Sequence, residues 1–297
     1  MKYLLVLFFL FVGTVFASSG GVSGPTDDSK VCYPMDSAMV RIRYNRTWVR
    51  DTLLPGVDSV LNISPITLFA GKKGSAFYNE DRRADDETPV DLAYVNAMFG
   101  PNDKLLKAIT KLENERLFRD YSIGKTVVHQ SYGMEGWELR EDIEKPDWEI
   151  EDSTMNILGF HCVKAVADFR GRKWIAWFAP ELPLPEGPWK LCGLPGIILK
   201  AYDSKHHYTY EATDIDTKNP GTVDYFNYRD RMRIRDRRKG LMFRREAMHS
   251  DHNLKMIRAI VGDKAPKRLK SSGPKNYDFQ ETDYEHLPMK EYSRQDD

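Results

Sequence analysis

The chain has 297 residues, with 44 lysines and arginines against 44 aspartates and glutamates. This balance excludes the strong positive field that attracts proteins to nucleic acid or to anionic membranes, so we expect no nucleic-acid partner. Three cysteines are too few for a fold built on disulfides. An aromatic content of 12% suits a β-rich core.

The first seventeen residues have the pattern of a secretory signal. "MKYLLVLFFLFVGTVFA" carries one lysine, then an apolar run from Leu4 to Val12, then small residues up to a cleavage site after Ala17. The apolar run is shorter than the roughly 20 residues of a membrane-spanning helix, so a membrane anchor is the weaker alternative. We therefore predict a signal peptide at residues 1–17 and an exported protein, periplasmic, outer-membrane associated or secreted, with no transmembrane span after cleavage.

After a Gly- and Ser-rich flexible leader at residues 18–32, the first ordered pattern is a hairpin. "SPITLFAGKKGSAFYNE" places an apolar run, a Gly-Lys-Lys-Gly turn and a second apolar run in sequence over residues 64–80. Between residues 91 and 121 the spacing of apolar residues changes to that of a helix, which predicts a helical insert. Its apolar stripe consists of Leu105, Leu106, Ile109 and Leu112.

The clearest pattern is a series of short strands that begins near residue 125. "CVKAVADF", residues 162–169, alternates apolar and polar positions as a half-buried strand does. Arg170 and Gly171 then turn the chain, and "KWIAWF", "GIILKAYD" and "YTYEATDI" follow as further strands. Sequential strands with short links predict an antiparallel meander.

The C-terminal third is harder to interpret. Residues 228–245 fit either a strand with an arginine-lined face or a helix, and we favour a helix after about Arg235. "NLKMIRAIVG", residues 253–262, has helical spacing. Residues 263–297 contain almost no apolar side chains and are predicted to be a disordered tail. We predict that residues 33–262 form a single domain.

A compact motif, GLPGII, occupies residues 193–198. Pro195 followed by Gly196 is the signature of a type II turn, and Gly193 allows a close backbone approach. The apolar residues that follow predict a strand covered on both faces. No helix and no Lys-Ser/Thr pair follows at the spacing of a phosphate loop, so we interpret the motif as structural. Its members are Gly193, Leu194, Pro195, Gly196, Ile197 and Ile198.

This stretch resembles the GLPGLI family. The similarity extends over "GFHCVKAVADFRGRKWIAWFAPELPLPEGPWKLCGLPGIILKAYD" and, more weakly, over the N-terminal hairpin, with Cys192 a departure from the family pattern. The resemblance implies an exported protein of a Gram-negative envelope. The family has no established activity, so the resemblance leaves the function open.

Basic and aromatic side chains near this motif are candidate binding residues. An outward-facing Trp177 beside Trp189 would form an apolar shelf with arginines nearby, suited to a sugar or peptide. The alternative is ordinary packing with guanidinium groups over tryptophan rings. The candidates are Arg170, Arg172, Trp174, Trp177 and Trp189.

Cys162 and Cys192 are the candidate disulfide, with Cys32 as a competitor. A simple meander puts their strands two spacings apart, roughly 9–10 Å, whereas a disulfide needs Cα atoms within about 7 Å. Pairing would therefore require the proline-rich loop to fold back over the sheet.

We find no pattern for a metal, a cofactor or a catalytic site. His161 and Cys162 are adjacent and point in opposite directions on a strand. His249 and His252 lack a third ligand at suitable spacing. No nucleophile motif is present.

We therefore predict an α+β fold, a large, mostly antiparallel and curved half-barrel sheet with helices packed on one side. The predicted function is a non-catalytic binding, carrier or accessory protein for an apolar or extended ligand, with an envelope or outer-membrane protein as a further candidate partner. The alternative is a hydrolase that uses Cys162, His161 and nearby carboxylates.

Overall fold

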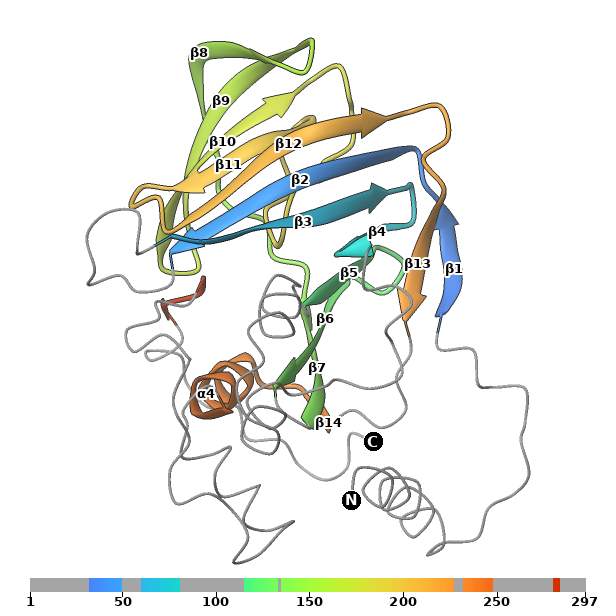
Figure 1. Cartoon of the computed structure of the whole chain (residues 1–297), viewed down its shortest axis with the longest axis vertical. Helices are drawn as coiled ribbons and strands as arrows, with labels where there is room; N and C mark the ends of the chain where they lie inside the picture. The colour runs from blue at the N-terminus through green and yellow to red at the C-terminus, as the bar shows by residue number, and fades with distance from the viewer. Residues whose placement is uncertain are drawn as a thin grey trace, which may run out of the picture.

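The computed structural model describes residues 32–49, 60–80, 115–132, 135–226, 232–247 and 280–283. Within these ranges the chain forms a series of strands and one helix (Figure 1). The elements are β1 (Cys32–Ser37), β2 (Val40–Val49), β3 (Val60–Ala70), β4 (Gly74–Tyr78), β5 (Arg116–Asp120), β6 (Lys125–Tyr132), β7 (Glu135–Asp142), β8 (Glu149–Ile157), β9 (Phe160–Phe169), β10 (Arg172–Ala179), β11 (Ile197–Asp203), β12 (Tyr208–Asp216), β13 (Thr222–Phe226), β14 (Met232–Ile234) and α4 (Arg237–Ala247).

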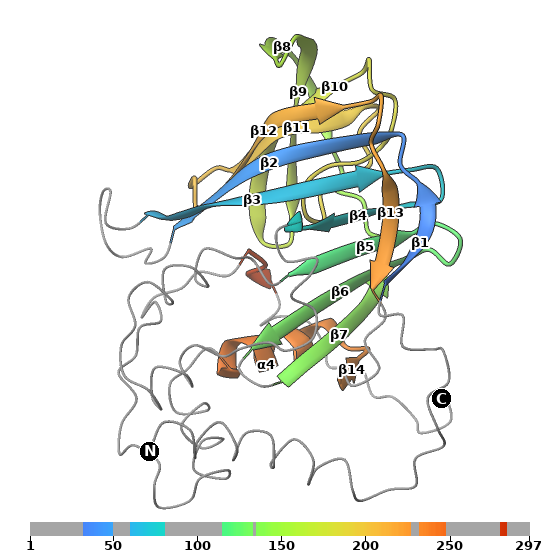
Figure 2. The same cartoon turned by 45° about the vertical axis from the view of Figure 1, so that its right-hand side comes forward.

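One large sheet contains twelve of these strands, in the order β14-β7-β6-β5-β4-β3-β2-β12-β11-β10-β9-β8. Neighbouring strands are antiparallel except β14 and β7, which are parallel. β1 and β13 pair with each other in a separate two-stranded ribbon. Figure 2 shows that the strand direction turns progressively from β8 to β7, the twist expected of a large sheet.

The predicted fold class was wrong in its helical part. The described residues are 61% strand, and α4 is the single helix among them. Helices packed on one side of the sheet are not seen in this part of the chain. Residues 116–120, the described end of the expected helical insert, form strand β5 because their apolar side chains alternate between two cores. The large, mostly antiparallel sheet is as predicted.

At β4 and β5 the sheet buries both of its faces. On β4, Phe77 belongs to the larger apolar cluster, whereas Ala76 and Tyr78 belong to a smaller one on the opposite face. On β5, Leu117 and Phe118 divide in the same way. Because successive side chains of a strand point to opposite faces, near-continuous apolar runs are what a doubly covered sheet requires.

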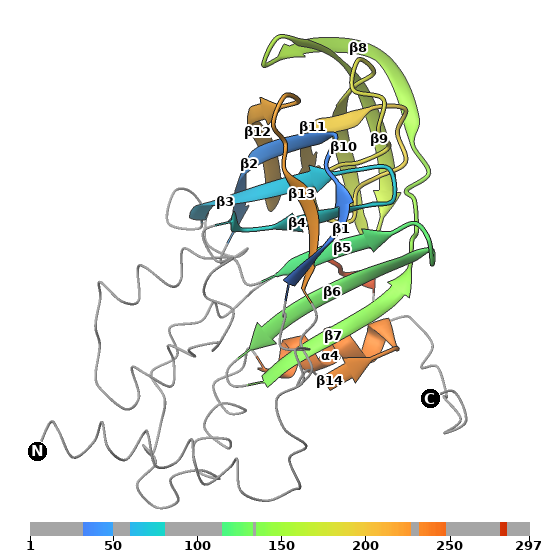
Figure 3. The same cartoon turned by 90° about the vertical axis from the view of Figure 1, so that its right-hand side faces the viewer.

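The smaller cluster is covered by the β1–β13 ribbon. Val223 and Phe226 of β13 pack with Phe69, Tyr78 and Phe118 of the sheet. The ring centroids of Tyr78 and Phe226 are 5.3 Å apart, in an edge-to-face arrangement. Figure 3 shows the ribbon lying across β4, β5 and β6.

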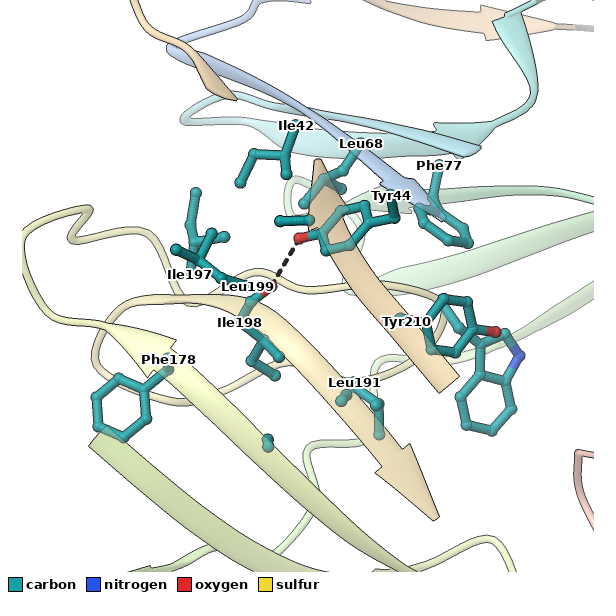
Figure 4. Packing of buried hydrophobic residues seen from close by; sticks show 14 of the residues in the cluster. Ile42, Tyr44, Leu68, Phe77, Phe178, Leu191, Ile197, Ile198, Leu199 and Tyr210 are labelled. Atoms are coloured by element: carbon teal, nitrogen blue, oxygen red, sulfur yellow. Dashed lines mark hydrogen bonds between the residues drawn. The ribbon is translucent and has the colours of Figure 1, made fainter. Parts of the chain in front are cut away.

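The proline-rich segment 180–196 covers the other face. Its Trp189, Leu191 and Leu194 are buried in the larger cluster, which also contains Tyr44 and Phe77 (Figure 4). The hydroxyl of Tyr44 donates a hydrogen bond of 2.6 Å to the carbonyl oxygen of Ile198, next to this segment. The loop therefore fills this face of the sheet with its own apolar side chains.

The GLPGII motif forms the corner that starts β11. Ile197, Ile198 and Leu199 are fully buried, as predicted. The turn differs from the expected type II: the Gly196 N–H donates to the Leu194 carbonyl, and the Ile197 N–H donates to the loop residue Leu182. A Cβ at Gly196 would lie 2.2 Å from the carbonyl oxygen of Ala179, so this corner requires glycine.

The strands predicted from alternation are confirmed. The Gly71–Gly74 turn joins β3 to β4, and β8 to β12 form an antiparallel meander. Helix α4 begins two residues after Arg235, preceded by the short strand β14, so both interpretations of this segment occur in succession.

Several other predictions lie outside the described residues. They are the signal peptide at 1–17, most of the leader, the insert at 91–114 and the helix at 253–262. Among the residues that are described, no helix has the length and apolar character needed to cross a membrane.

Candidate functional site

The five candidate binding residues do not form one surface. Trp174 and Trp189 are buried in the larger apolar cluster, with ring centroids 5.6 Å apart, so Trp189 is no part of an exposed shelf. Trp177 is half-buried, between the buried Ala176 and Phe178. The remaining two candidates, both arginines, lie at the turn between β9 and β10.

This turn is a tight hairpin made by Arg170 and Gly171. Their φ angles are +55° and +80°, the pattern of the two-residue turn whose twist matches that of an antiparallel pair. The turn places Arg170 and Arg172 on either side of Gly171. Arg172 follows as the first residue of β10, with its side chain on the buried face.

Two further cations complete what we call the cationic site, which consists of Arg170, Arg172, Lys190 and Arg237. Lys190 comes from the proline-rich loop and Arg237 from the first turn of α4, whose N-terminus is capped by the Asp236 carboxylate at 2.8 Å from the Lys239 N–H. The exposed fractions of the four side chains lie between 4% and 11%. Four largely buried cations require anionic partners.

Residues 280–283, Gln-Glu-Thr-Asp, supply two of those partners. The Glu281 carboxylate lies 2.6 Å from Lys190 Nζ, 2.5 Å from Arg237 Nε and 3.7 Å from Arg170 Nη1. Asp283 forms a two-pronged ion pair with the Arg237 guanidinium, at 3.1 and 2.5 Å. In Figures 1 and 2 this segment, drawn in red, lies between α4 and the sheet.

Polar contacts fix the backbone of the same segment. The Thr282 N–H donates to the Arg170 carbonyl at 3.0 Å, and its hydroxyl donates to the Gly171 carbonyl at 2.9 Å. Arg172 Nε donates to the Gln280 carbonyl at 3.0 Å, and the Gln280 amide donates to the Tyr210 hydroxyl at 2.8 Å. The segment is thus held by main-chain and side-chain contacts at once.

Gly171 allows this close approach. A Cβ at this position would lie 2.3 Å from the Thr282 hydroxyl and 2.7 Å from the Asp283 nitrogen. Any other residue at position 171 would therefore collide with the segment as well as strain the turn.

The segment balances the charge of the site. Without it, the four cations face two buried carboxylates, Glu141 and Asp203, at 2.5 Å from Lys190 and 2.9 Å from Arg172. The excess is two positive charges, partly screened by the exposed Glu144 beside Arg170. Glu281 and Asp283 add two negative charges. Burial by itself would raise the pKa of Glu281, but Lys190, Arg237 and Arg170 outweigh it and hold that pKa well below its usual range.

These four residues belong to the tail at 263–297 that was predicted to be disordered, and the structure places them against the β9–β10 turn. Gln280 and Glu281 are 3% and 4% exposed. The sequence also missed Lys190, Arg237 and Glu141. No local pattern could have shown them, because the contacts of Arg237 and Lys190 with Glu281 join residues 44 and 91 positions apart.

The possible disulfide is not formed. Cys162 and Cys192 are free, buried thiols. Cys162 pairs across the sheet with Met155 on β8, while Cys192 Sγ lies 3.9 Å from the Glu144 carbonyl oxygen. The proline-rich loop does fold back over the sheet, but it brings Cys192 to the chain beyond β7 and not to Cys162.

The same cysteine gives no support to the hydrolase alternative. Burial raises the pKa of the Cys162 thiol to about 11, so almost no thiolate is present at neutral pH. His161 is exposed and, as the neighbouring residue on the strand, faces the opposite side. The two residues therefore do not form a nucleophile–base pair.

A second buried charge network lies under the proline-rich loop. Arg119 of β5 forms an ion pair with Glu186, both less than 2% exposed, and donates to the Trp189 carbonyl. Tyr121 donates its hydroxyl to Glu186. This network fixes the loop on the sheet and leaves no carboxylate oxygen available to a ligand. Among the described residues, no three His, Cys, Asp or Glu side chains gather in a way that could hold a metal ion.

Comparisons with known proteins do not assign the chain to a family. No family model matches the chain, and no curated protein matches it. Two solved structures of PNGF-II, in the P21 and C2 space groups, align with TM-scores of 0.44 and 0.42 at 13% and 12% identity. The alignments cover 70% and 67% of this chain, and the chain spans about a third of those structures, 32% and 31%. We draw nothing about fold or function from likeness at this level.

Proposed function

We propose that this protein is an exported, non-catalytic binding protein that receives a polypeptide segment at the cationic site. The signal-peptide pattern of residues 1–17 and the resemblance to the GLPGLI family support the export, to the periplasm or the outer membrane. The contacts of residues 280–283 support the binding role.

One observation carries the proposal: the site already holds a peptide segment. Arg172 and the two turn carbonyls at residues 170 and 171 contact the backbone or hydroxyl of that segment, as a peptide-binding surface does. Of the two ligand types expected from the sequence, an extended ligand fits this site. An apolar ligand has less support, because Trp189, Leu191 and Leu194 are buried in the larger apolar cluster and fill that face of the sheet.

The test uses the full chain as the variant E281Q/D283N, in which residues 280–283 have lost the two carboxylates that contact the cationic site. The probe is a fluorescent synthetic peptide with the sequence of residues 278–285, DFQETDYE, titrated at low salt and followed by anisotropy. We expect saturable binding to this variant. Binding to the wild-type chain should be at least about 10-fold weaker, because the attached segment competes at a high effective concentration.

Two further variants in the E281Q/D283N chain locate the binding. Arg237→Ala removes a cation of the site and should abolish saturation, whereas Lys205→Ala removes an exposed cation on the β11–β12 turn and should leave the affinity unchanged. If the peptide shows no saturable binding, or if Arg237→Ala and Lys205→Ala behave alike, the proposed function is wrong.

A further inference from the structure

We infer that the cationic site selects peptides that carry two carboxylates two positions apart, in the pattern Glu-x-Asp. This inference rests on the proposed function and names its ligand class. The chain's own residues 281–283 have this pattern and occupy the site as an internal competitor.

The geometry of the segment defines the spacing. Glu281 and Asp283 both reach Arg237, whereas Thr282 between them faces the Gly171 carbonyl. Alternate side chains thus point in opposite directions, as they do in a nearly extended backbone. A carboxylate at the middle position would point at the Gly171 carbonyl oxygen, which would repel it.

Arg237 contacts both carboxylates, and Lys190 contacts the first of them as well. The first lies in the buried part of the site, between Lys190 and Arg237, with its side chain 5% exposed. The second is received by the planar guanidinium of Arg237 through two parallel contacts, and its side chain is 33% exposed. A guanidinium recognises the planar carboxylate geometry specifically, so Arg237 reads both anionic positions of the ligand.

The charge of the site agrees with a divalent ligand. The Glu141 carboxylate lies 4.0 Å from Arg237 Nε, whereas Glu281 and Asp283 both lie 2.5 Å from this guanidinium. A ligand with two carboxylates therefore gives this largely buried cation the two close anionic partners that its burial favours.

The experiment compares peptides on the E281Q/D283N chain by competition with the labelled DFQETDYE probe. DFQEDTYE is the matched control, because it has the same composition and net charge but places the carboxylates that correspond to Glu281 and Asp283 next to each other. DFQQTDYE and DFQETNYE each lack one carboxylate. We expect all three to bind about 10- to 100-fold more weakly than the parent peptide, the loss expected for a charge-assisted hydrogen bond.

A second readout separates this inference from the proposed function. In the wild-type chain, an excess of unlabelled DFQETDYE should raise the hydrogen-exchange rate of residues 280–283, because it displaces them from the β9–β10 turn. Equal affinity of DFQETDYE and DFQEDTYE would overturn the Glu-x-Asp inference and leave peptide binding in place. Failure of every peptide to bind would overturn the proposed function itself.

Discussion

Arg237 and Asp283, 46 residues apart in the chain, form a two-pronged ion pair that ties the first turn of α4 to the C-terminal segment. The Arg237 side chain is 11% exposed, so its charge depends on Asp283 and Glu281 for compensation. A helix that starts with a cation is disfavoured by its own dipole, and these two carboxylates offset that cost. The contact between α4 and the rest of the molecule is therefore electrostatic at this point.

Arg237→Ala should destabilise the protein by about 3 kcal/mol, because it leaves Glu281 buried with less compensation. Asp283→Ala should cost less, since its carboxylate is partly exposed. The double variant should cost less than the sum of the two, by about 1 kcal/mol or more, because both residues belong to one network. Urea denaturation of the four chains measures the coupling, with Lys205→Ala as the control for lost charge. Strict additivity would mean that the ion pair does not stabilise the folded chain.

Acid should destabilise the wild-type protein through Glu281. Its folded pKa lies well below the value of about 4.3 in an unfolded chain, so its contribution is complete above that pH and is lost as the pH falls below it. E281Q removes this titration and should flatten the fall in unfolding free energy between about pH 5 and pH 2.

Some acid sensitivity should remain in E281Q. Burial raises the pKa of Glu138, but hydrogen bonds and charge from His129 and Arg140 lower it to about 2, and this group is untouched by the variant. Denaturant midpoints measured across this pH range test both statements. An unchanged slope in E281Q would show that Glu281 is not ion-paired in solution.

Gly171→Ala should release residues 280–283 from the turn, because the new Cβ would lie 2.3 Å from the Thr282 hydroxyl. Gly159→Ala is the matched control: its φ is +88°, close to the +80° of Gly171, and no atom lies within 4 Å of its Cβ. Both variants carry the backbone strain of about 1 kcal/mol, but only Gly171→Ala meets the segment. Hydrogen exchange of residues 280–283 should therefore rise in Gly171→Ala alone. Equal exchange in the two variants would contradict the described contact.

Cys162 and Cys192 should resist alkylation in the native protein. Both are buried thiols whose pKa burial raises, to about 11 for Cys162. Iodoacetamide at pH 7.5, followed by peptide mapping, should label neither residue until urea is added. Rapid labelling of Cys162 in the folded chain would revive the hydrolase alternative, which needs a reactive thiol there.

Glu186→Ala should loosen the proline-rich loop and cost about 3–5 kcal/mol, because it leaves Arg119 buried without its carboxylate. Glu149→Ala on the exposed edge strand β8 is the control for loss of a glutamate and should have little effect. Intrinsic tryptophan fluorescence reports on the loop, since Trp189 follows Glu186 closely and is buried with Trp174. An unchanged stability would mean that the loop is held by apolar packing alone.

Much of the sheet could be predicted because the pattern that defines a strand is local. In residues 162–169 the alternation of Ala165 and Ala167 with Lys164 and Asp168 is visible in eight letters of sequence, and β9 follows it. The Gly71–Gly74 and Arg170–Gly171 turns contain glycine, which marks a turn in the sequence itself. Their positions could therefore be predicted too. The helix predicted over residues 91–121 was wrong at residues 116–120. A strand that is covered on both faces has no apolar–polar alternation to distinguish it from a helix.

The amino-acid sequence by itself determined most of the strands and the turns at residues 71–74 and 170–171, because these depend on residues within a few positions of one another. The need for glycine at positions 171 and 196 was decided by contacts with Thr282 and Ala179. Only the tertiary structure decided which charges meet. Lys190, Arg237 and Glu281 come from a loop, a helix and a tail that have no shared periodicity, and they are brought together by the folding of the loop over the sheet. Ion pairs act through space and carry no register along the chain. For this reason a segment that looked disordered by composition is held by ion pairs, and two arginines predicted to lie near an aromatic shelf contact carboxylates.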